Sequence, residues 1–496
     1  MAHALAGKPV QEQDIIDVQT IVDAYFDNVP DMTNPTQLVS FGTSGHRGTS
    51  VDGTFTDLHV AAITQAICDG RKQFGATGPI FVGQDTHALS QPALVTVLEV
   101  LAGNGVTAMV DCDMAFVPTP SVSRAIIRYN EEHDDKADGI IITPSHNPPD
   151  NGGIKYNTII GGPADTVVTK WIEMRANEYL TAYCESEDFK RISIDNIEPT
   201  AQVPYDYKGL YVEELGDVIN MEAIKAAGPK VLVDTLGGSG ASYWNAIKER
   251  YGLDLTIIHD DYDPTFSFMT YDHDGKVRMD CSSTYVMASV INRIGDFDLA
   301  VGNDPDYDRY GIVVSSGLIS ANTFLTLAAR YLFTTRGWKN KGVGKTVVCT
   351  TMIDKWAADA ETPVFEVPVG FKYFSQFLFD GAIGIGGEES AGASFLKKDG
   401  TVWTTDKDGM IMALLSMEIM AVMGKSALKM AYEFVEEFGN PSFGRIDAPC
   451  KKEQKQILKQ MSAELITATT VDGDPITNIR TTSLYNDMPI DGVRVE

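Results

Sequence analysis

Residues 139–149 read GIIITPSHNPP, a run typical of a buried strand that ends in a rigid polar loop. The apolar residues 140–142 supply the strand, and the prolines restrict the backbone of the loop. In open α/β sheets, ligands bind beyond the carboxyl ends of the strands. The hydroxyl of Ser145, next to His146, is therefore a candidate nucleophile. Taken by itself, the motif also fits a plain turn that contains a serine and a histidine.

The same organisation occurs five times along the chain, where a short β-type run leads into a polar loop with glycine or proline. Helical periodicity fills segments between these runs. Such alternation predicts α/β layers with largely parallel sheets. The predicted strands are residues 79–82, 139–142, 230–233, 298–301 and 382–385, and the clearest predicted helices are 58–74, 91–104, 241–250 and 410–423.

The chain divides into four predicted units, as its 496 residues suggest. They span residues 1–205, 206–317, 318–440 and 441–496. Polar segments at 131–137 and 184–205 are the linker candidates of the first half, and residues 316–317 and 439–441 mark two later boundaries.

The composition excludes several classes of protein. A net charge of −28 disfavours a nucleic-acid surface, and no segment has the roughly 18 consecutive apolar residues of a membrane helix. The start of the chain lacks the apolar core of a signal peptide, and the six cysteines have no CxxC spacing that would indicate zinc or a disulfide framework. We therefore expect a cytoplasmic protein with no nucleic-acid or membrane partner. In so acidic a chain, cations within glycine-bearing loops are candidate ligands of an anionic substrate.

The run DPDYDR (residues 304–309) follows one of the predicted strands and suggests a metal site. Asp304, Asp306 and Asp308 alternate along a loop that we expect to be nearly extended, so their carboxylates project to one side. Oxygen-only ligands suit Mg²⁺. A calcium EF-hand is excluded, because the loop lacks its required glycine and glutamate. A solvated acidic turn remains the alternative.

Several other loops carry chemistry that is ambiguous when each is considered singly. The glycines of residues 41–48 offer backbone amides to phosphate, Arg47 adds a bidentate donor, and His46 is potentially cationic. Lys155 could approach the site of Ser145, with a surface lysine as the alternative. The carboxylates and hydroxyl of residues 387–392 suit sugar hydroxyls, although a helix N-cap explains them almost as well. Residues 370–373 and 406–409 are similar cases.

Together these features point to phosphoryl transfer through a covalent serine phosphate. The sequence has no GxxxxGK[ST] loop, which disfavours a P-loop nucleotide enzyme. A lysine could act as the base of such a reaction only if its pKa were lowered toward about 7–8.

Five motifs resemble the α-D-phosphohexomutase superfamily and, within it, the bacterial phosphoglucomutases. They are FGTSGHRG (41–48), TPSHNPPDNGGIKYN (143–157), GNDPDYDRYGI (302–312), VPVGFKYF (367–374) and GGEESAGASF (386–395). The resemblance covers nearly the whole chain. It implies three successive mixed α/β sheet domains and an α+β C-terminal domain around a central cleft. It also implies interconversion of glucose 1-phosphate and glucose 6-phosphate, with Mg²⁺ as cofactor and glucose 1,6-bisphosphate as intermediate and activator.

The resemblance also implies roles for particular residues. Ser145 would be the phosphoserine, with Mg²⁺ held against its phosphate by Asp304, Asp306 and Asp308. The catalytic group would include the candidate acid/base lysines Lys155 and Lys407 together with His146 and Arg309. The substrate would be bound by Thr43, Ser44, Arg47 and Lys372, and its sugar hydroxyls by Glu388 and Ser390.

Two departures from the family pattern limit these expectations. Ala391 and Gly392 stand where some relatives have a histidine, which disfavours a mannose-type or dual specificity. After Asn440 no loop of the Arg-Pro-Ser-Gly-Thr type is found, so we expect a partial fourth domain without a phosphate-binding loop and a correspondingly poor mutase. The only arginines there are Arg445, Arg480 and Arg494.

Other functions stay open at this point. One is a related phosphohexomutase or phosphopentomutase, or a mutase for an amino-sugar phosphate. The other is a truncated, non-catalytic binding paralogue. A monomer and a homodimer are equally compatible with the sequence.

Overall fold

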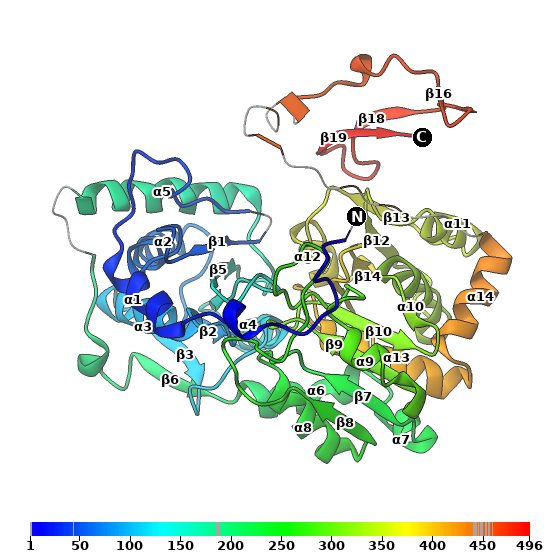
Figure 1. Cartoon of the computed structure of the whole chain (residues 1–496), viewed down its shortest axis with the longest axis horizontal. Helices are drawn as coiled ribbons and strands as arrows, with labels where there is room; N and C mark the ends of the chain where they lie inside the picture. The colour runs from blue at the N-terminus through cyan, green and yellow to red at the C-terminus, as the bar shows by residue number, and fades with distance from the viewer. Residues whose placement is uncertain are drawn as a thin grey trace.

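The structure is a computed structural model that describes residues 2–42, 44–184, 189–439 and 460–496, with a few positions between 444 and 458. It contains successive mixed α/β sheets, which confirms the predicted fold class. In Figure 1 the first sheet lies on the left, the second and third lie together on the right, and the C-terminal strands lie above them. Asn440 and Arg445 lie outside the described residues, and the division into four units stays a prediction.

The first sheet has six strands in the order β1-β5-β4-β2-β3-β6. Its central strand β4 is buried on both faces, as its apolar run predicts. Ile140 and Ile142 pack with α2, α3 and α5, whereas Ile141 points to the opposite face and packs with α4. The elements are η1 (Glu12–Asp14), α1 (Val18–Asp27), β1 (His46–Thr49), α2 (Asp57–Gly70), β2 (Ile80–Gln84), α3 (Ser90–Gly103), β3 (Ala108–Asp111), α4 (Thr119–Glu132), β4 (Asp138–Ile142), β5 (Asn151–Asn157), α5 (Thr166–Cys184), η2 (Ile194–Asn196) and β6 (Gln202–Tyr205).

The second sheet has five strands in the order β11-β10-β9-β7-β8. Its central strands β7 and β9 are parallel and fully buried. The elements are α6 (Tyr207–Val218), α7 (Met221–Ala227), β7 (Val231–Asp234), α8 (Ala241–Tyr251), β8 (Leu255–Ile258), α9 (Ala288–Ile291), η3 (Ile294–Asp296), β9 (Leu299–Asn303), β10 (Tyr310–Val314) and β11 (Gly317–Leu318).

The third sheet has four strands in the order β13-β12-β14-β15 and shares one apolar core with the second. Helix α13 joins them, because it packs against α7, β9 and β10 as well as β15. The elements are α10 (Ala321–Arg336), β12 (Gly342–Thr346), α11 (Met352–Asp359), β13 (Val364–Val367), α12 (Lys372–Phe379), β14 (Ile383–Gly387), β15 (Ala393–Phe395), α13 (Gly409–Met423) and α14 (Ala427–Phe438).

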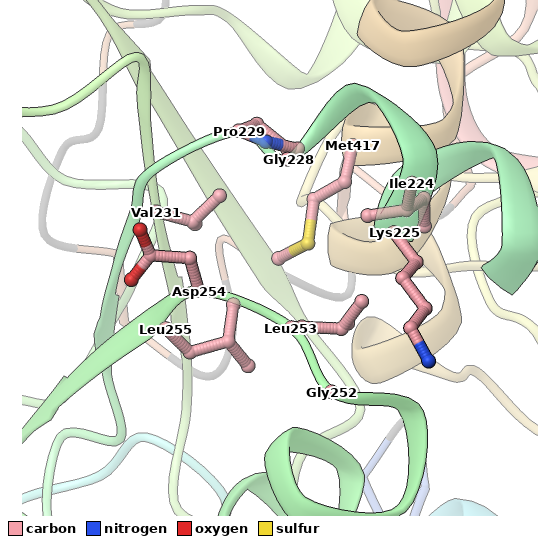
Figure 2. Close-up of a pocket in the computed structure, with 10 residues that line it drawn as sticks. All are labelled: Ile224, Lys225, Gly228, Pro229, Val231, Gly252, Leu253, Asp254, Leu255 and Met417. Carbon is pink, nitrogen blue, oxygen red and sulfur yellow. The ribbon is translucent and has the colours of Figure 1, made fainter.

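A small cavity of about 70 Å³ lies beside α13 at the edge of the shared core. Figure 2 shows Met417 pointing from α13 into the space between Val231, Leu253 and Leu255. Within the described part of the chain, no single helix is long and apolar enough to cross a membrane. Among the described helices, only α13 and α14 taken together have the length and composition of a membrane span, and this pair is bent by 78°.

The C-terminal strands dock on the edge strand β13 of the third sheet. The carboxylate of Glu366 in β13 forms ion pairs with Nη1 of Arg480 at 2.6 Å and with Nη1 of Arg494 at 3.0 Å. The ring of Tyr485 stacks on that of Phe365, with their centroids 4.1 Å apart. The elements are η4 (Ala463–Leu465), β16 (Thr470–Val471), β17 (Asp474–Pro475), β18 (Ile479–Thr482) and β19 (Pro489–Val495).

Three features differ from the sequence-based expectation. The polar segment 184–205 is not only a linker, because its end forms β6, which pairs in parallel with β3. The helix predicted over 58–74 ends at Gly70, since the chain turns there toward β2. The start of the chain lies against the second sheet domain, where the amides of Gly7 and Val10 donate to the carbonyls of Tyr271 and Met269.

Candidate active site

Ser145 lies just beyond the carboxyl end of β4. Its φ is 60°, in the left-handed region that a serine rarely adopts. Only 1% of its surface is exposed. Its Oγ donates to Oδ2 of Asp304 at 2.9 Å and lies 3.2 Å from Nδ1 of His146. The hydroxyl is therefore aimed at the acidic loop of the second domain.

The acidic loop after β9 is a turn, and the expectation of a nearly extended segment was wrong. Tyr307 has a φ of 63°, and the amide of Arg309 donates back to Oδ1 of Asp304 at 2.9 Å. The turn nevertheless gathers Asp304, Asp306 and Asp308, whose nearest oxygens lie within 4.8 Å of one another. All three side chains are buried, which excludes a solvated acidic turn.

Two lysines balance part of this negative charge. Nζ of Lys155 lies 2.5 Å from Oδ2 of Asp306 and 3.1 Å from Oδ2 of Asp308, and Nζ of Lys407 lies 2.9 Å from the same Asp308 oxygen. Burial lowers the pKa of each lysine, but the carboxylates outweigh it and hold both pKa values above the ordinary one. The lowered pKa that a lysine base requires is therefore not found here.

The cluster retains free oxygens that fit a cation. Oδ1 of Asp306 and Oδ1 of Asp308 are buried and have no hydrogen-bond partner among the described residues. Burial, reinforced by these two neighbouring carboxylates, raises the pKa of Asp304 well above its usual range. Three buried carboxylates, two of which have an oxygen with no hydrogen-bond partner among the described residues, are the kind of donor set that Mg²⁺ prefers.

Arg309 and His146 lie at the edge of the cluster. Nη1 of Arg309 donates to Oδ2 of Asp280 at 3.3 Å, and Nε2 of His146 lies 4.0 Å from the same oxygen. Burial, followed by the charge of Arg309, holds the pKa of His146 well below its ordinary value. The imidazole beside Ser145 is therefore neutral.

A cleft of about 610 Å³ opens between the first and third domains. Arg309 and Lys407 line it and also approach Asp308, so they connect the cleft to the buried aspartates. Among the residues expected to bind substrate, the cleft is lined by Ser44, Arg47, Lys372, Glu388 and Ser390. Thr43 lies outside the described residues.

The glycine loop of residues 41–48 places the guanidinium of Arg47 at the cleft, whereas the imidazole of His46 is not among the groups that line it. Gly45 has no space for a side chain, because a Cβ there would lie 2.5 Å from the carbonyl oxygen of Ile154. Arg47 donates to the Ser44 hydroxyl at 3.4 Å. His46 is buried between backbone carbonyls, and burial lowers its pKa, which disfavours the cationic form that the sequence left possible.

The opposite wall of the cleft comes from the third domain. Oε1 of Glu388 accepts from the amide of Gly370 at 3.1 Å, which fixes the carboxylate at the cleft wall. Nζ of Lys372, at the start of α12, donates to the hydroxyl of Thr166 at 3.0 Å. Lys372 therefore bridges the third domain to the first while it faces the cleft.

Two site residues, Thr119 and Asp280, were missed by the sequence analysis, and a third, Asp406, lies in a run that it left ambiguous. Thr119, at the start of α4, donates to Oδ2 of Asp306 at 2.8 Å. Asp280 binds Arg309, and Asp406 accepts from Nδ2 of Asn157 at 2.9 Å across the domain boundary. Thr119 and Asp280 belong to no motif, whereas Asp406 lies beside Lys407 in the run 406–409, to which the sequence analysis assigned no role.

Comparison with known proteins shows relatives along most of the chain. Three families match in succession: "Phosphoglucomutase/phosphomannomutase, alpha/beta/alpha domain I" at residues 38–182, domain II at 210–317 and domain III at 320–438. A phosphoglucomutase of Komagataeibacter xylinus is 46% identical over 495 residues, which cover 99% of this chain and 89% of that protein. The chain belongs to the phosphoglucomutase/phosphomannomutase family. Another relative is phosphoglucomutase 1 of Saccharomyces cerevisiae, 27% identical over 84% of this chain and 76% of that protein.

Solved structures support the family fold. A putative phosphomannomutase of Thermus thermophilus superimposes with a TM-score of 0.68 at 24% identity, over 81% of this chain and 84% of the other. The Paramecium phosphoglucomutase parafusin, in its open form, gives a TM-score of 0.67 at 20% identity, over 83% and 76%.

Proposed function

We propose that this family member is a phosphoglucomutase, which interconverts glucose 1-phosphate and glucose 6-phosphate. Phosphoserine at Ser145 would be the phosphoryl carrier, and glucose 1,6-bisphosphate the intermediate. One observation carries the proposal: the Ser145 hydroxyl contacts Asp304 of a buried aspartate triad, and Lys407, which is paired with the triad, lines a cleft together with Arg47 and Lys372. The name of the 46% identical relative supports the choice of sugar.

The reaction would consist of two phosphoryl transfers in opposite directions. In the first, the free hydroxyl oxygen of the sugar phosphate bonds to phosphorus, and the bond from phosphorus to Ser145 Oγ breaks. The proton that the sugar hydroxyl gives up is the proton that Oγ takes up, so that protons and charge balance. In the second transfer, the other phosphoryl group of the bisphosphate returns to Ser145. His146, with Nδ1 3.2 Å from Oγ, is placed to hydrogen-bond with that oxygen as the transfer proceeds.

The charged residues would align and neutralise the transferring group, which is most of what phosphoryl transfer requires. Asp304, Asp306 and Asp308 would hold Mg²⁺, which when bound supplies charge neutralisation at the phosphoryl oxygens. Lys407 and Arg309 both line the cleft, so we assign them N–H donation to the same oxygens.

The remaining assignments follow from the position of each residue relative to the cleft. Lys155 does not line the cleft, and we assign it the role of holding Asp306 and Asp308 in place. Glu388 and Ser390 would accept and donate hydrogen bonds to the sugar hydroxyls. Arg47 and Lys372, on opposite walls, would bind phosphate.

The test uses the full chain with glucose 1-phosphate, Mg²⁺ and a trace of glucose 1,6-bisphosphate. We expect glucose 6-phosphate to form, and phosphate to map to Ser145 in the purified protein by intact mass and peptide analysis. Ser145→Ala should reduce turnover by at least 10³-fold, since the carrier oxygen is lost. Ser416→Ala is the matched control, because that buried hydroxyl bonds a backbone carbonyl within α13.

Phosphate found only on another residue would contradict the assignment of Ser145. Mannose 1-phosphate, pentose 1-phosphate and N-acetylglucosamine 1-phosphate in the same assay test the sugar. If kcat/KM for one of these sugar phosphates exceeds that for glucose 1-phosphate, that sugar takes the place of glucose in the proposal. The phosphoserine chemistry is unaffected by that outcome.

A further inference from the structure

A buried polar network lies beneath the Ser145 loop and takes no part in the transfer steps described above. Its centre is Asp85, which follows β2 and is fully buried. The Asp85 carboxylate accepts four hydrogen bonds: from the amide of His87 at 3.0 Å, Nδ1 of His87 at 2.9 Å, the Ser90 hydroxyl at 2.6 Å and the Thr143 hydroxyl at 2.5 Å. A carboxylate with this many donors is held in one orientation.

Two contacts of this network reach the loop that carries Ser145. The hydroxyl oxygen of Thr143 accepts from the amide of Ser145 at 2.7 Å. Nε2 of His87 lies 3.0 Å from the carbonyl oxygen of Asn147, on the far side of the serine. The network therefore holds the loop both before and after Ser145.

The direction of these hydrogen bonds is set by Asp85. A hydroxyl has one proton to donate. Because Asp85 accepts the proton of Thr143, a lone pair of the same oxygen is left to face the amide of Ser145. His87 has acceptors at both ring nitrogens, Asp85 on one side and the Asn147 carbonyl on the other, and only the imidazolium donates to both.

The geometry of Ser145 depends on such support. Its left-handed backbone is strained for a residue with a side chain, and it persists only where the surroundings impose it. Gly153 of β5 packs closely against the start of this loop, since a Cβ there would be 2.2 Å from the Thr143 carbonyl oxygen. This backbone conformation directs Oγ to Asp304 at 2.9 Å.

We propose that Thr143, oriented by Asp85 and His87, is a positioning residue that holds the backbone of Ser145 so that Oγ stays aligned with the aspartate triad. The inference rests on the proposed role of Ser145 as phosphoryl carrier. Phosphoryl transfer is sensitive to alignment, and a displacement of about 1 Å can reduce the rate about 100-fold.

The experiment compares Thr143→Val, which keeps the shape and removes the hydroxyl, with Thr143→Ser, which keeps the hydroxyl. Both are assayed as the full chain with glucose 1-phosphate, Mg²⁺ and glucose 1,6-bisphosphate. The kcat is expressed per mole of Ser145 phosphate, counted by intact mass, so that misfolded protein does not contribute. Thr64→Val is the matched control, because its buried hydroxyl bonds the Val60 carbonyl within α2.

We expect Thr143→Val to lower this kcat about 10- to 100-fold with KM within about threefold of wild type. The kcat of Thr143→Ser should lie within about threefold of the wild-type value, and that of Thr64→Val should equal it. If Thr143→Val does not fold, His87→Gln carries the test with the same expected fall in kcat.

Wild-type kcat per phosphoserine in Thr143→Val would overturn the inference, as would equal losses in the Val and Ser variants. Failure of the proposed function has a different signature, namely a Ser145→Ala protein that turns over as fast as wild type.

Discussion

At the scale of the residue, Ser145 combines a strained backbone with a fixed side chain. A left-handed conformation costs a non-glycine residue roughly 1–3 kcal/mol, and such strain persists where the surrounding structure imposes it. The three aspartates facing it are likewise an unfavourable arrangement when considered alone, because buried like charges repel. Both features concentrate at one point, where a phosphoryl group would be transferred.

The first prediction concerns Asp306. Asp306→Asn should lower kcat about 100-fold or more and change KM by less than about threefold, because the lost charge acts where charge develops in the transition state. Steady-state kinetics with glucose 1-phosphate at saturating Mg²⁺ measure both constants. Asp261→Asn, an exposed site in the same domain, is the control. A raised KM at unchanged kcat would mean that the triad serves substrate binding only.

At the scale of the element, helix α13 links the core to the site. Its N-cap Asp408 accepts from the amide of Ile411 at 3.1 Å, from the Trp403 indole at 2.8 Å and from the Tyr211 hydroxyl at 2.8 Å. Tyr211 belongs to α6 of the second domain, so one carboxyl group joins two domains. Burial raises the pKa of Asp408 from 3.8 to about 6.

This pKa predicts a pH dependence of stability. The pKa of Asp408 is higher in the folded state than in the unfolded chain. Its contribution to the free energy of unfolding is therefore complete below about pH 4 and is lost as pH rises through about 6. Two pKa units correspond to roughly 3 kcal/mol. Asp408→Asn cannot titrate, so the Tm of wild type relative to this variant should fall between pH 4 and pH 6.5. Calorimetry measures it, and exposed Asp380→Asn should show no such trend.

At the scale of the whole molecule, the second and third domains share one apolar core, and the other parts attach by different means. The first domain meets them at the site through hydrogen bonds and ion pairs, such as Lys155 with Asp306 and Asn157 with Asp406, and beside the site through a smaller apolar contact of Tyr207 with α4. The C-terminal strands attach through Glu366, whose side chain is 3% exposed and which receives two arginines.

The attachment of the C-terminal strands can be tested at Glu366. Glu366→Gln removes the charge between Arg480 and Arg494, and breaking a buried ion pair on one side typically costs about 3–5 kcal/mol. We expect amide hydrogen exchange over residues 479–495 to accelerate at least tenfold, with β4 unchanged. Glu361→Gln, an exposed site shortly before β13, is the control. Unchanged exchange would show that the stacking of Tyr485 suffices to dock the strands.

The sequence predicted some of these features because they are local. The strand before Ser145 and the strand before Asp304 are short apolar runs, and the carboxyl end of a strand indicates where reactive groups gather. Thr119 and Asp280 reach the site only through folding, and no residue pattern marks them. The turn at Tyr307 was missed because a left-handed tyrosine is set by its surroundings rather than by local propensity.

The unequal attachment of the domains has a calorimetric consequence. Hydration of apolar surface raises the heat capacity, whereas hydration of polar surface lowers it slightly. Separating the first domain from the others would expose the polar contacts of the site and a smaller apolar contact, in which Tyr207 of α6 packs with Phe81 and α4, so the change in heat capacity would be modest. Separating the second domain from the third would open the core around α13 and change it strongly. Opening of the cleft side should therefore have a smaller thermal signature than separation of the second and third domains, whose boundary behaves as the interior of a single folded unit.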